Sequence, residues 1–195
     1  MAAMVQAESV VFEIEDNYQK QSYRNRTYIA HSNGILLLNI PIKHSKNGIK
    51  QKTKEVQVEN AFPWQSQHWK SLQSAYRTSP YFEFYEDDIR PLFEVEATSL
   101  LDFNMKAFTL ICELLSLEIN HTFSEEYFKS PQQTDLRFLA NPKLKKDFKF
   151  QTYTQVLNKS GEFIPNLSIL DLLFNEGPNA MSYLELQSLD FNPNQ

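Results

Sequence analysis

The dipeptide Asn33-Gly34 is the strongest constraint on the fold of this chain. It separates two apolar and β-branched runs, residues 27–30 and 35–40. Asn and Gly tolerate the positive φ angles that a tight turn requires, so the pattern predicts a β-hairpin with two antiparallel strands. Pro41 cannot donate a hydrogen bond to a central ladder, which places the end of the second strand at the rim of a sheet.

Two segments near the start of the chain predict a helix followed by a strand. Residues 1–7 are rich in alanine, which favours helix, and residues 9–15 form a β-branched and aromatic run typical of a strand. A helix that leads into a strand is the second half of a βαβ unit. Together with the hairpin, this arrangement predicts an α/β fold, a single domain with a mixed β-sheet and flanking α-helices.

Apolar residues at helical spacing predict two longer helices. The first covers residues 64–77 and ends before Pro80, because the residue before a proline is pushed out of the α region. The second covers residues 99–117, and Ser99 with Asp102 forms a capping-box pattern at its start. We interpret the wide apolar stripe of this second helix as core.

Weaker patterns complete the expected fold. Residues 55–58 and 153–157 predict short strands, and residues 81–85 fit either a helix or a strand. A second capping-box pattern, Ser168 with Asp171, predicts one more helix. Gly177-Pro178 supplies the signal that ends this helix and starts another.

Length and charge exclude several classes of function. A chain of 195 residues is most simply one domain with a substantial single core. Its net charge of −5 argues against a nucleic-acid partner, because phosphate affinity needs a basic face. No apolar stretch reaches the ~20 residues needed to cross a bilayer, and no signal peptide is visible, so we expect a cytoplasmic protein without a membrane span.

Motifs for cofactor or metal chemistry are missing from the sequence. The four glycines are too widely spaced for a dinucleotide fingerprint or a Walker sequence, and there is no Gly-x-Ser-x-Gly elbow for a serine nucleophile. The histidines show no paired spacing, and Cys112 stands alone in an apolar helical run, where we interpret it as a core residue. We therefore predict no cofactor and no metal site.

Three cations lie close together in residues 17–26, directly after an acidic strand-like run. They are Lys20, Arg24 and Arg26, with the amide of Asn25 between the two arginines. Ammonium and guanidinium groups make charge-assisted hydrogen bonds to phosphate and carboxylate. The segment therefore predicts a cradle for an anionic small molecule.

Further candidates surround this cradle. If the strand that ends at Glu15 is an inner strand, its C-terminal edge is where open α/β sheets bind ligands. Asp16 would then accept a substrate proton or hydrogen bond, and His68 would act as a general base, because imidazole titrates near neutral pH. Tyr76, on the same predicted helix as His68, is a further candidate for substrate binding.

Each candidate also has a purely structural interpretation. Arg24 and Arg26 can pair with the carboxylates within residues 13–16 and tie a loop to the sheet. His68 can be a hydrogen-bonded core histidine, and Tyr76 a packing residue with a polar end. From the residues alone, both interpretations remain open.

A lysine-rich segment follows the hairpin. It contains Lys43, Lys46, Lys50, Lys52 and Lys54 and shows no apolar periodicity. Such a run is typical of a solvated loop, and the alternative is that it attracts an anionic substrate.

Five blocks of the sequence resemble one known family. They are Asp16–Arg26, Asn33-Gly34 with Leu38–Ile42, Trp64 with His68-Trp69 and Tyr76, Ser79–Phe82, and Pro165–Asn175. Together these blocks resemble the WbqC-like family, whose members occur in O-antigen and other surface-polysaccharide gene clusters. Family members begin with a strand and a Tyr-Phe-Pro-Pro type segment, whereas this sequence starts inside the helix that follows. The resemblance thus predicts one WbqC-like domain over residues 1–195, truncated at its N-terminus.

The resemblance implies a function in surface-polysaccharide biosynthesis. One form is a transferase that passes an acyl or aminoacyl group, glycine included, to a sugar, with a sugar nucleotide or an acyl donor as the anionic ligand. The alternative is a non-catalytic protein of the same pathway that binds a sugar nucleotide or acts as a scaffold. The missing nucleophile motif favours binding, whereas the cluster of Asp16, Lys20 and the arginines, with a distant His68, favours catalysis.

Overall fold

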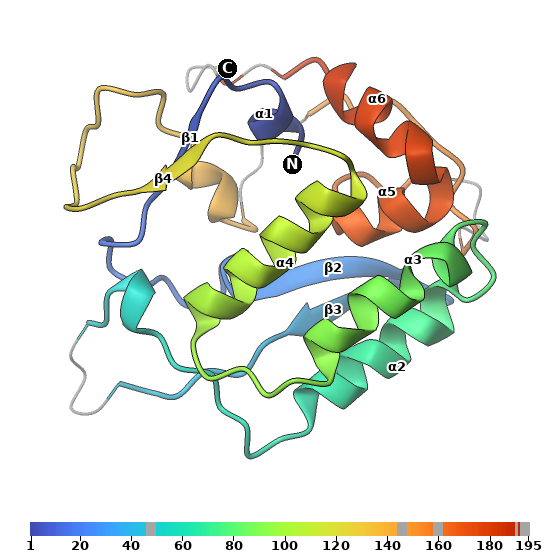
Figure 1. The fold of residues 1–195 in the computed structure, drawn as a ribbon, viewed down its shortest axis with the longest axis horizontal. Coiled ribbons are helices and arrows are strands. Elements are labelled where there is room, and N and C mark those ends of the chain that lie inside the picture. Colours follow the sequence, from blue (N-terminus) through green and yellow to red (C-terminus); the bar gives the residue numbers. More distant parts are fainter. Residues whose placement is uncertain (46–49, 144–147, 158–161, 190, 192–195) are drawn as a thin grey trace.

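The computed structural model describes residues 1–45, 50–143, 148–157, 162–189 and 191. The predicted hairpin lies at the centre of the molecule (Figure 1). Strand β2 (Arg26–His31) pairs antiparallel with β3 (Gly34–Asn39). Ser32 and Asn33 form the turn, and the positive φ angle falls on Gly34, at +113°. The hairpin is confirmed, but Asn33 does not take the positive φ angle that we expected of it.

A second pair of strands is parallel and lies apart from the hairpin in Figure 1. Strand β1 (Val10–Phe12), which follows the short helix α1 (Ala2–Val5), pairs with β4 (His121–Phe123). The sequence predicted β1 but not β4. Parallel and antiparallel pairing are therefore both present in this single-domain α/β fold, as two two-stranded sheets.

The remaining regular secondary structure is helical. The α-helices are α2 (Trp64–Tyr76), α3 (Phe82–Ile89), α4 (Leu100–Leu114), α5 (Ile169–Glu176) and α6 (Ala180–Glu185). Short 3₁₀ helices are η2 (Thr53–Glu55), η3 (Arg90–Phe93), η4 (Arg137–Ala140) and η5 (Gly177–Asn179). Helix α4 begins as predicted, because the Ser99 side chain accepts a hydrogen bond from the backbone N–H of Asp102. Residues 81–85, which fitted either a helix or a strand, lie at the start of helix α3.

Two predicted strands are wrong. Residues 55–58 form the end of η2 and two isolated bridges, Ile42 with Val58 and Gln57 with Ser99. Residues 153–157 make no strand pairing within the described chain. The side chains of Tyr153 and Gln155 instead donate hydrogen bonds to the buried carboxylate of Asp171. Lys46 of the lysine-rich segment lies outside the described residues.

The main core lies between the hairpin and the helices. Buried residues of β2, β3 and helices α2 to α6 form one cluster, which includes Ile29, Leu72, Phe82, Ile111 and Phe174. A smaller cluster of Ile40, Val56, Val58, Trp64 and Leu100 packs beside it. Leu38 of β3 belongs to the main cluster and Ile40, directly after β3, to the smaller one, so this end of the hairpin contributes to both clusters.

Asp171 occupies the middle of the main core. Its side chain is fully buried and accepts hydrogen bonds from the Tyr76 hydroxyl at 2.7 Å and the Tyr153 hydroxyl at 2.5 Å. The Gln155 amide adds a third, at 3.1 Å. The expected role of Asp171 in a capping box is thus wrong, although Ser168 does cap α5 by accepting from the N–H of Leu170 at 3.3 Å.

Gly177 and Gly34 give a matched test of backbone and packing constraints. Both have positive φ angles, but a Cβ on Gly177 would lie 2.5 Å from the Tyr81 ring, whereas a Cβ on Gly34 would meet nothing within 4 Å. We expect Gly34→Ala to lower the free energy of unfolding by about 1–3 kcal/mol through backbone strain alone. Gly177→Ala should cost about 1–3 kcal/mol more, because it also overpacks the core.

Urea unfolding of both variants measures these losses. The Tyr81→Ala background supplies the control, since it removes the ring and should bring the cost of Gly177→Ala down to that of Gly34→Ala. Equal costs of the two glycine substitutions in the wild-type background would contradict the packing argument.

Candidate functional site

A cavity of about 220 Å³ lies between the start of the hairpin and helix α4. Four of the predicted site residues line it: Arg24, Asn25, Arg26 and His68. Most of the wall is apolar and comes from β3 and helices α2, α4 and α5, and none of the carboxylates in the described part of the chain lines it. The structure thus brings together cations, an amide and an imidazole that lie far apart in the sequence, inside a largely apolar surrounding.

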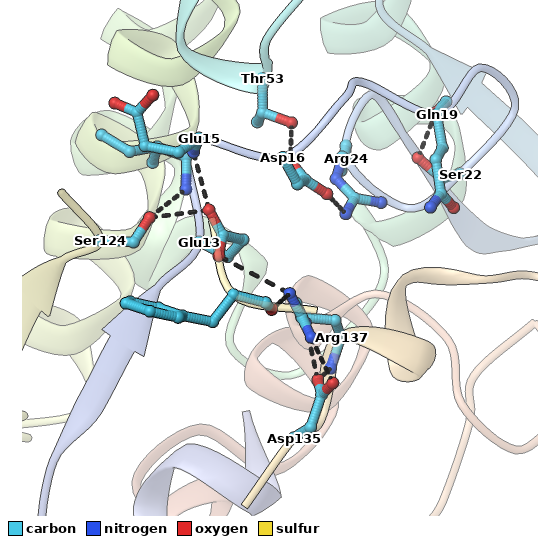
Figure 2. Close-up of polar contacts among 12 residues, drawn as sticks. Glu13, Glu15, Asp16, Gln19, Ser22, Arg24, Thr53, Ser124, Asp135 and Arg137 are labelled. Carbon is cyan, nitrogen blue, oxygen red and sulfur yellow. Dashed lines mark hydrogen bonds and ion pairs between the residues drawn. The ribbon is translucent and has the colours of Figure 1, made fainter. Parts of the chain in front are cut away.

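Arg24 is held by an ion pair with Asp16 (Figure 2). Arg24 Nη2 lies 2.5 Å from Asp16 Oδ2, and both side chains are mostly buried. The Thr53 hydroxyl donates to the other carboxylate oxygen of Asp16, and the Thr53 backbone N–H donates to the Asp16 carbonyl at 2.9 Å. Asp16 itself does not line the cavity. Its carboxylate is therefore engaged in holding Arg24, as the structural interpretation expected.

Arg26 differs from Arg24 in that its side chain has no partner among the described residues. Its Nε atom is buried and makes no hydrogen bond, and no ion pair of Arg26 is found among the described residues. Tyr18 Oη and Asn25 Oδ1 are also buried and unpartnered, so three of the four such side-chain atoms in the described chain come from the predicted cradle. Buried polar atoms are normally hydrogen-bonded, and an exception calls for a physical reason. A bound ligand would supply it.

Asn25 is fixed so that its acceptor remains free. Its Nδ2 atom donates to the carbonyl oxygen of Ile40 at 2.9 Å and to Asn39 Oδ1 at 3.2 Å, which ties it to β3. Its Oδ1 atom has no partner. Arg26 and Asn25 both line the cavity, and each carries a buried polar atom that has no partner in the described chain. A ligand that carries both an anionic group and a hydroxyl or amino group matches this pair.

His68 enters the cavity from helix α2 as a neutral imidazole. Its side chain is 9% exposed, with the Trp64 ring 5.1 Å away and the Phe93 ring 6.4 Å away. Burial lowers its pKa from 6.5 to about 4, and a hydrogen bond to the Asn39 backbone opposes this shift only in part.

The remaining predicted residues lie outside the cavity. Lys20 is exposed and does not line it. Tyr76 is 1% exposed, and its hydroxyl donates to Asp171 and accepts from the Ala30 N–H at 3.1 Å. Burial, with the Asp171 carboxylate beside it, raises the pKa of Tyr76 far above its usual value. Tyr76 is a core residue, as its structural interpretation expected.

The described lysines of the lysine-rich segment also lie away from the cavity. Lys52 Nζ and Lys54 Nζ each lie 2.5 Å from a carboxylate oxygen of Glu15. The hydrogen bond from Lys52, followed by that from Lys54, lowers the pKa of Glu15. These two lysines are therefore paired within the protein, and both half-exposed ammonium groups contact a carboxylate that is itself largely buried.

Asn104 and Ser168 are among the polar lining residues that the sequence analysis did not predict. Asn104 lines the cavity from α4, and its Nδ2 donates to the Arg24 carbonyl oxygen at 2.8 Å. An amide four residues after Leu100, within the apolar stripe of that helix, was a signal that could have identified it. Ser168, which was assigned only as a helix cap, also lines the cavity.

The described residues contain neither a metal-binding group nor a membrane-spanning helix. The described residues hold no group of three or more His, Cys, Asp or Glu side chains arranged to bind a metal ion. Within the same residues, every helix is too short or too polar to cross a membrane.

Comparison with known proteins identifies the family. The WbqC-like protein family matches residues 1–146 and 143–183. The chain belongs to the WbqC-like family. It is also similar to the uncharacterised protein Rv1507c of Mycobacterium tuberculosis. The alignment extends over 194 residues with 25% identity, and the match covers 86% of this chain and 83% of the relative. No solved structure matches the chain.

The two arginines of this WbqC-like protein should respond differently to substitution. Arg24→Gln leaves Asp16 buried without its cation, so we expect the free energy of unfolding to fall by about 3 kcal/mol. Arg26→Gln removes a guanidinium that has no partner and should leave stability unchanged or raise it. Urea unfolding of both variants measures the difference. A loss of several kcal/mol from Arg26→Gln would show that Arg26 stabilises the fold.

The buried imidazole predicts how stability depends on pH. Between pH 6.5 and about 4, the unfolded chain protonates residue 68 whereas the folded chain keeps it neutral, so stability falls as the pH falls. At pH 5 this single group should account for about 2 kcal/mol of lost stability relative to pH 7. We expect His68→Gln to lack this loss, as measured by urea unfolding at both pH values.

The exposed His44 provides the control for this measurement. His44→Gln should show the same difference between pH 5 and pH 7 as the wild type. If His68→Gln also keeps the full wild-type difference, then His68 is not buried as a neutral imidazole in solution.

Proposed function

We propose that this protein is a cytoplasmic transferase of O-antigen or surface-polysaccharide biosynthesis, built as one WbqC-like domain, which passes an acyl or aminoacyl group to a sugar. The observation that carries the proposal is the unpartnered Arg26 guanidinium in the same cavity as the neutral imidazole of His68. Membership of the WbqC-like family supports the pathway.

Binding rests on the cation and the acceptor beside it. An anionic sugar nucleotide or acyl donor pairs its phosphate or carboxylate with Arg26, and Arg24, held in place by Asp16, adds a second positive side chain to the wall. Asn25 Oδ1 accepts a hydrogen bond from a hydroxyl or amino group of the ligand. The apolar wall excludes water, which strengthens each of these contacts.

His68 supplies the proton acceptor for transfer. A ring nitrogen of the neutral imidazole takes the proton of the sugar hydroxyl or amino group while that oxygen or nitrogen forms a bond to the acyl carbon. The bond between the acyl carbon and the leaving atom of the donor then breaks, and the proton passes to the leaving group. A bound anion raises the pKa of His68 from its value of about 4, so ligand binding itself brings the imidazole closer to the range of an effective base.

A second candidate function is binding without catalysis. The low pKa of His68 in the ligand-free protein and the engagement of Asp16 by Arg24 and Thr53 both favour it. In that case the protein recognises a sugar nucleotide for a partner enzyme of the same pathway, and Arg26 and Asn25 have the same roles as in the transferase.

A transfer assay with the full chain separates the two functions. Amino-sugar nucleotides are incubated with glycyl and acetyl thioesters, and mass spectrometry detects the sugar product heavier by one acyl group. We expect turnover by the wild type and a loss of about 10²-fold or more in His68→Gln, with the exposed His44→Gln as control. If sugar nucleotides bind in an Arg26-dependent manner but no donor yields a product, the binding function replaces the transferase.

A further inference from the structure

A second and larger cavity, of about 470 Å³, adjoins the first. The two share five lining residues: Tyr23, Arg26, Thr27, Ser168 and Ile169. The larger cavity extends from these residues toward α1 and the C-terminal helices α5 and α6. Arg26, the residue with the unpartnered guanidinium nitrogen, therefore stands in the wall between the two spaces.

Size indicates that a ligand of Arg26 uses both cavities. Small-molecule sites in proteins usually enclose about 300–1,000 Å³, and the smaller cavity, at about 220 Å³, falls below this range. The larger cavity lies within it. A ligand whose anionic group is bound by Arg26 can therefore place one end in each space.

Aromatic rings with fixed positions form one wall of the larger cavity. The Tyr153 ring packs edge-to-face with Phe163, centroids 5.1 Å apart, and with Tyr183, centroids 5.2 Å apart. The Tyr153 hydroxyl is bound by Asp171, and the Tyr183 hydroxyl donates to the Gln151 carbonyl oxygen at 2.6 Å. Both hydroxyls are thus used within the protein, and the rings themselves remain to contact a ligand.

Asn166, a polar residue with an unusual backbone conformation, also lines this cavity. Asn166 lines the larger cavity with a φ angle of +57°, and its exposed amide makes no hydrogen bond within the described chain. Non-glycine residues with positive φ angles concentrate at functional sites. Its amide can both donate and accept, which suits the hydrogen-bonding edge of a nucleobase.

We infer that the larger cavity is the base subsite of a nucleoside-diphosphate sugar. The base packs on the aromatic wall, the diphosphate pairs with Arg26 between the cavities, and the sugar enters the smaller cavity toward Asn25 and His68. Aromatic side chains bind bases of any sequence through their π-faces, and guanidinium groups bind phosphate in a fork geometry. The inference rests on the proposed function and specifies its substrate class.

Calorimetric titration of the full chain with UDP, GDP and inorganic pyrophosphate tests the inference. We expect at least one nucleoside diphosphate to bind about tenfold or more tightly than pyrophosphate, because only the nucleotide fills the base subsite. Phe163→Leu should remove this advantage and leave pyrophosphate binding unchanged. Phe84→Leu is the matched control, since Phe84 is 72% exposed and lines neither cavity.

The contribution of Arg26 is measured in the same titrations. Arg26→Gln should weaken nucleoside diphosphates and pyrophosphate alike, whereas Arg77→Gln, at an exposed position of no cavity, should weaken neither. Circular dichroism and thermal unfolding confirm that each variant is folded.

Two results would overturn the inference, and they separate it from the proposed function. If pyrophosphate binds through Arg26 but both nucleotides bind no more tightly, or if Phe163→Leu keeps their advantage, the base subsite is wrong and the anion site stands. If neither pyrophosphate nor a nucleotide binds to the wild type, the base subsite and the anion site of the proposed function both fail.

Discussion

The buried carboxylate of Asp171 is the interaction on which the rest of the structure depends. No cation of the described residues pairs with it, and three neutral donors hydrogen-bond to it: the hydroxyls of Tyr76 and Tyr153 and the amide of Gln155. Hydrogen bonds to a buried charge are stronger than those between neutral groups, and removing such a partner is correspondingly costly. The network joins helix α5 to α2 and to the segment around residue 153, none of which are neighbours in the sequence.

The same network positions both parts of the candidate site. The Tyr76 hydroxyl also accepts the N–H of Ala30, which fixes strand β2 against α2 in the core. Arg26 begins β2 and His68 lies on α2. The hydrogen bond between Ala30 and Tyr76 therefore helps to bring these two residues to the same cavity. Tyr153 extends from Asp171 into the wall of the larger cavity. The two cavities are thus supported by one set of hydrogen bonds.

The sequence predicted those parts of the fold that depend on local interactions. The hairpin and helices α2 and α4 follow from turn chemistry and apolar periodicity, which act over a few residues. Strand β4 was missed because its partner β1 lies more than a hundred residues earlier, and three exposed residues show no apolar pattern. Asp171 was misassigned because a Ser-x-x-Asp pattern has the same appearance whether the carboxylate caps a helix or is buried.

The candidate site shows why charge clusters are ambiguous in a sequence. Arg24 and Arg26 are the same residue type and lie two positions apart in the sequence. In the structure, Asp16 forms an ion pair with Arg24, whereas nothing in the described chain pairs with the side chain of Arg26. Among the described residues no carboxylate lines the cavity wall, and burial lowers the pKa of His68, so Arg26 brings a positive charge that this wall does not balance. An unpartnered buried donor destabilises a fold, and it persists only where the surrounding structure compensates for it. Here the Asp171 network and the core around it provide that stability, which leaves Arg26 available to bind an anion.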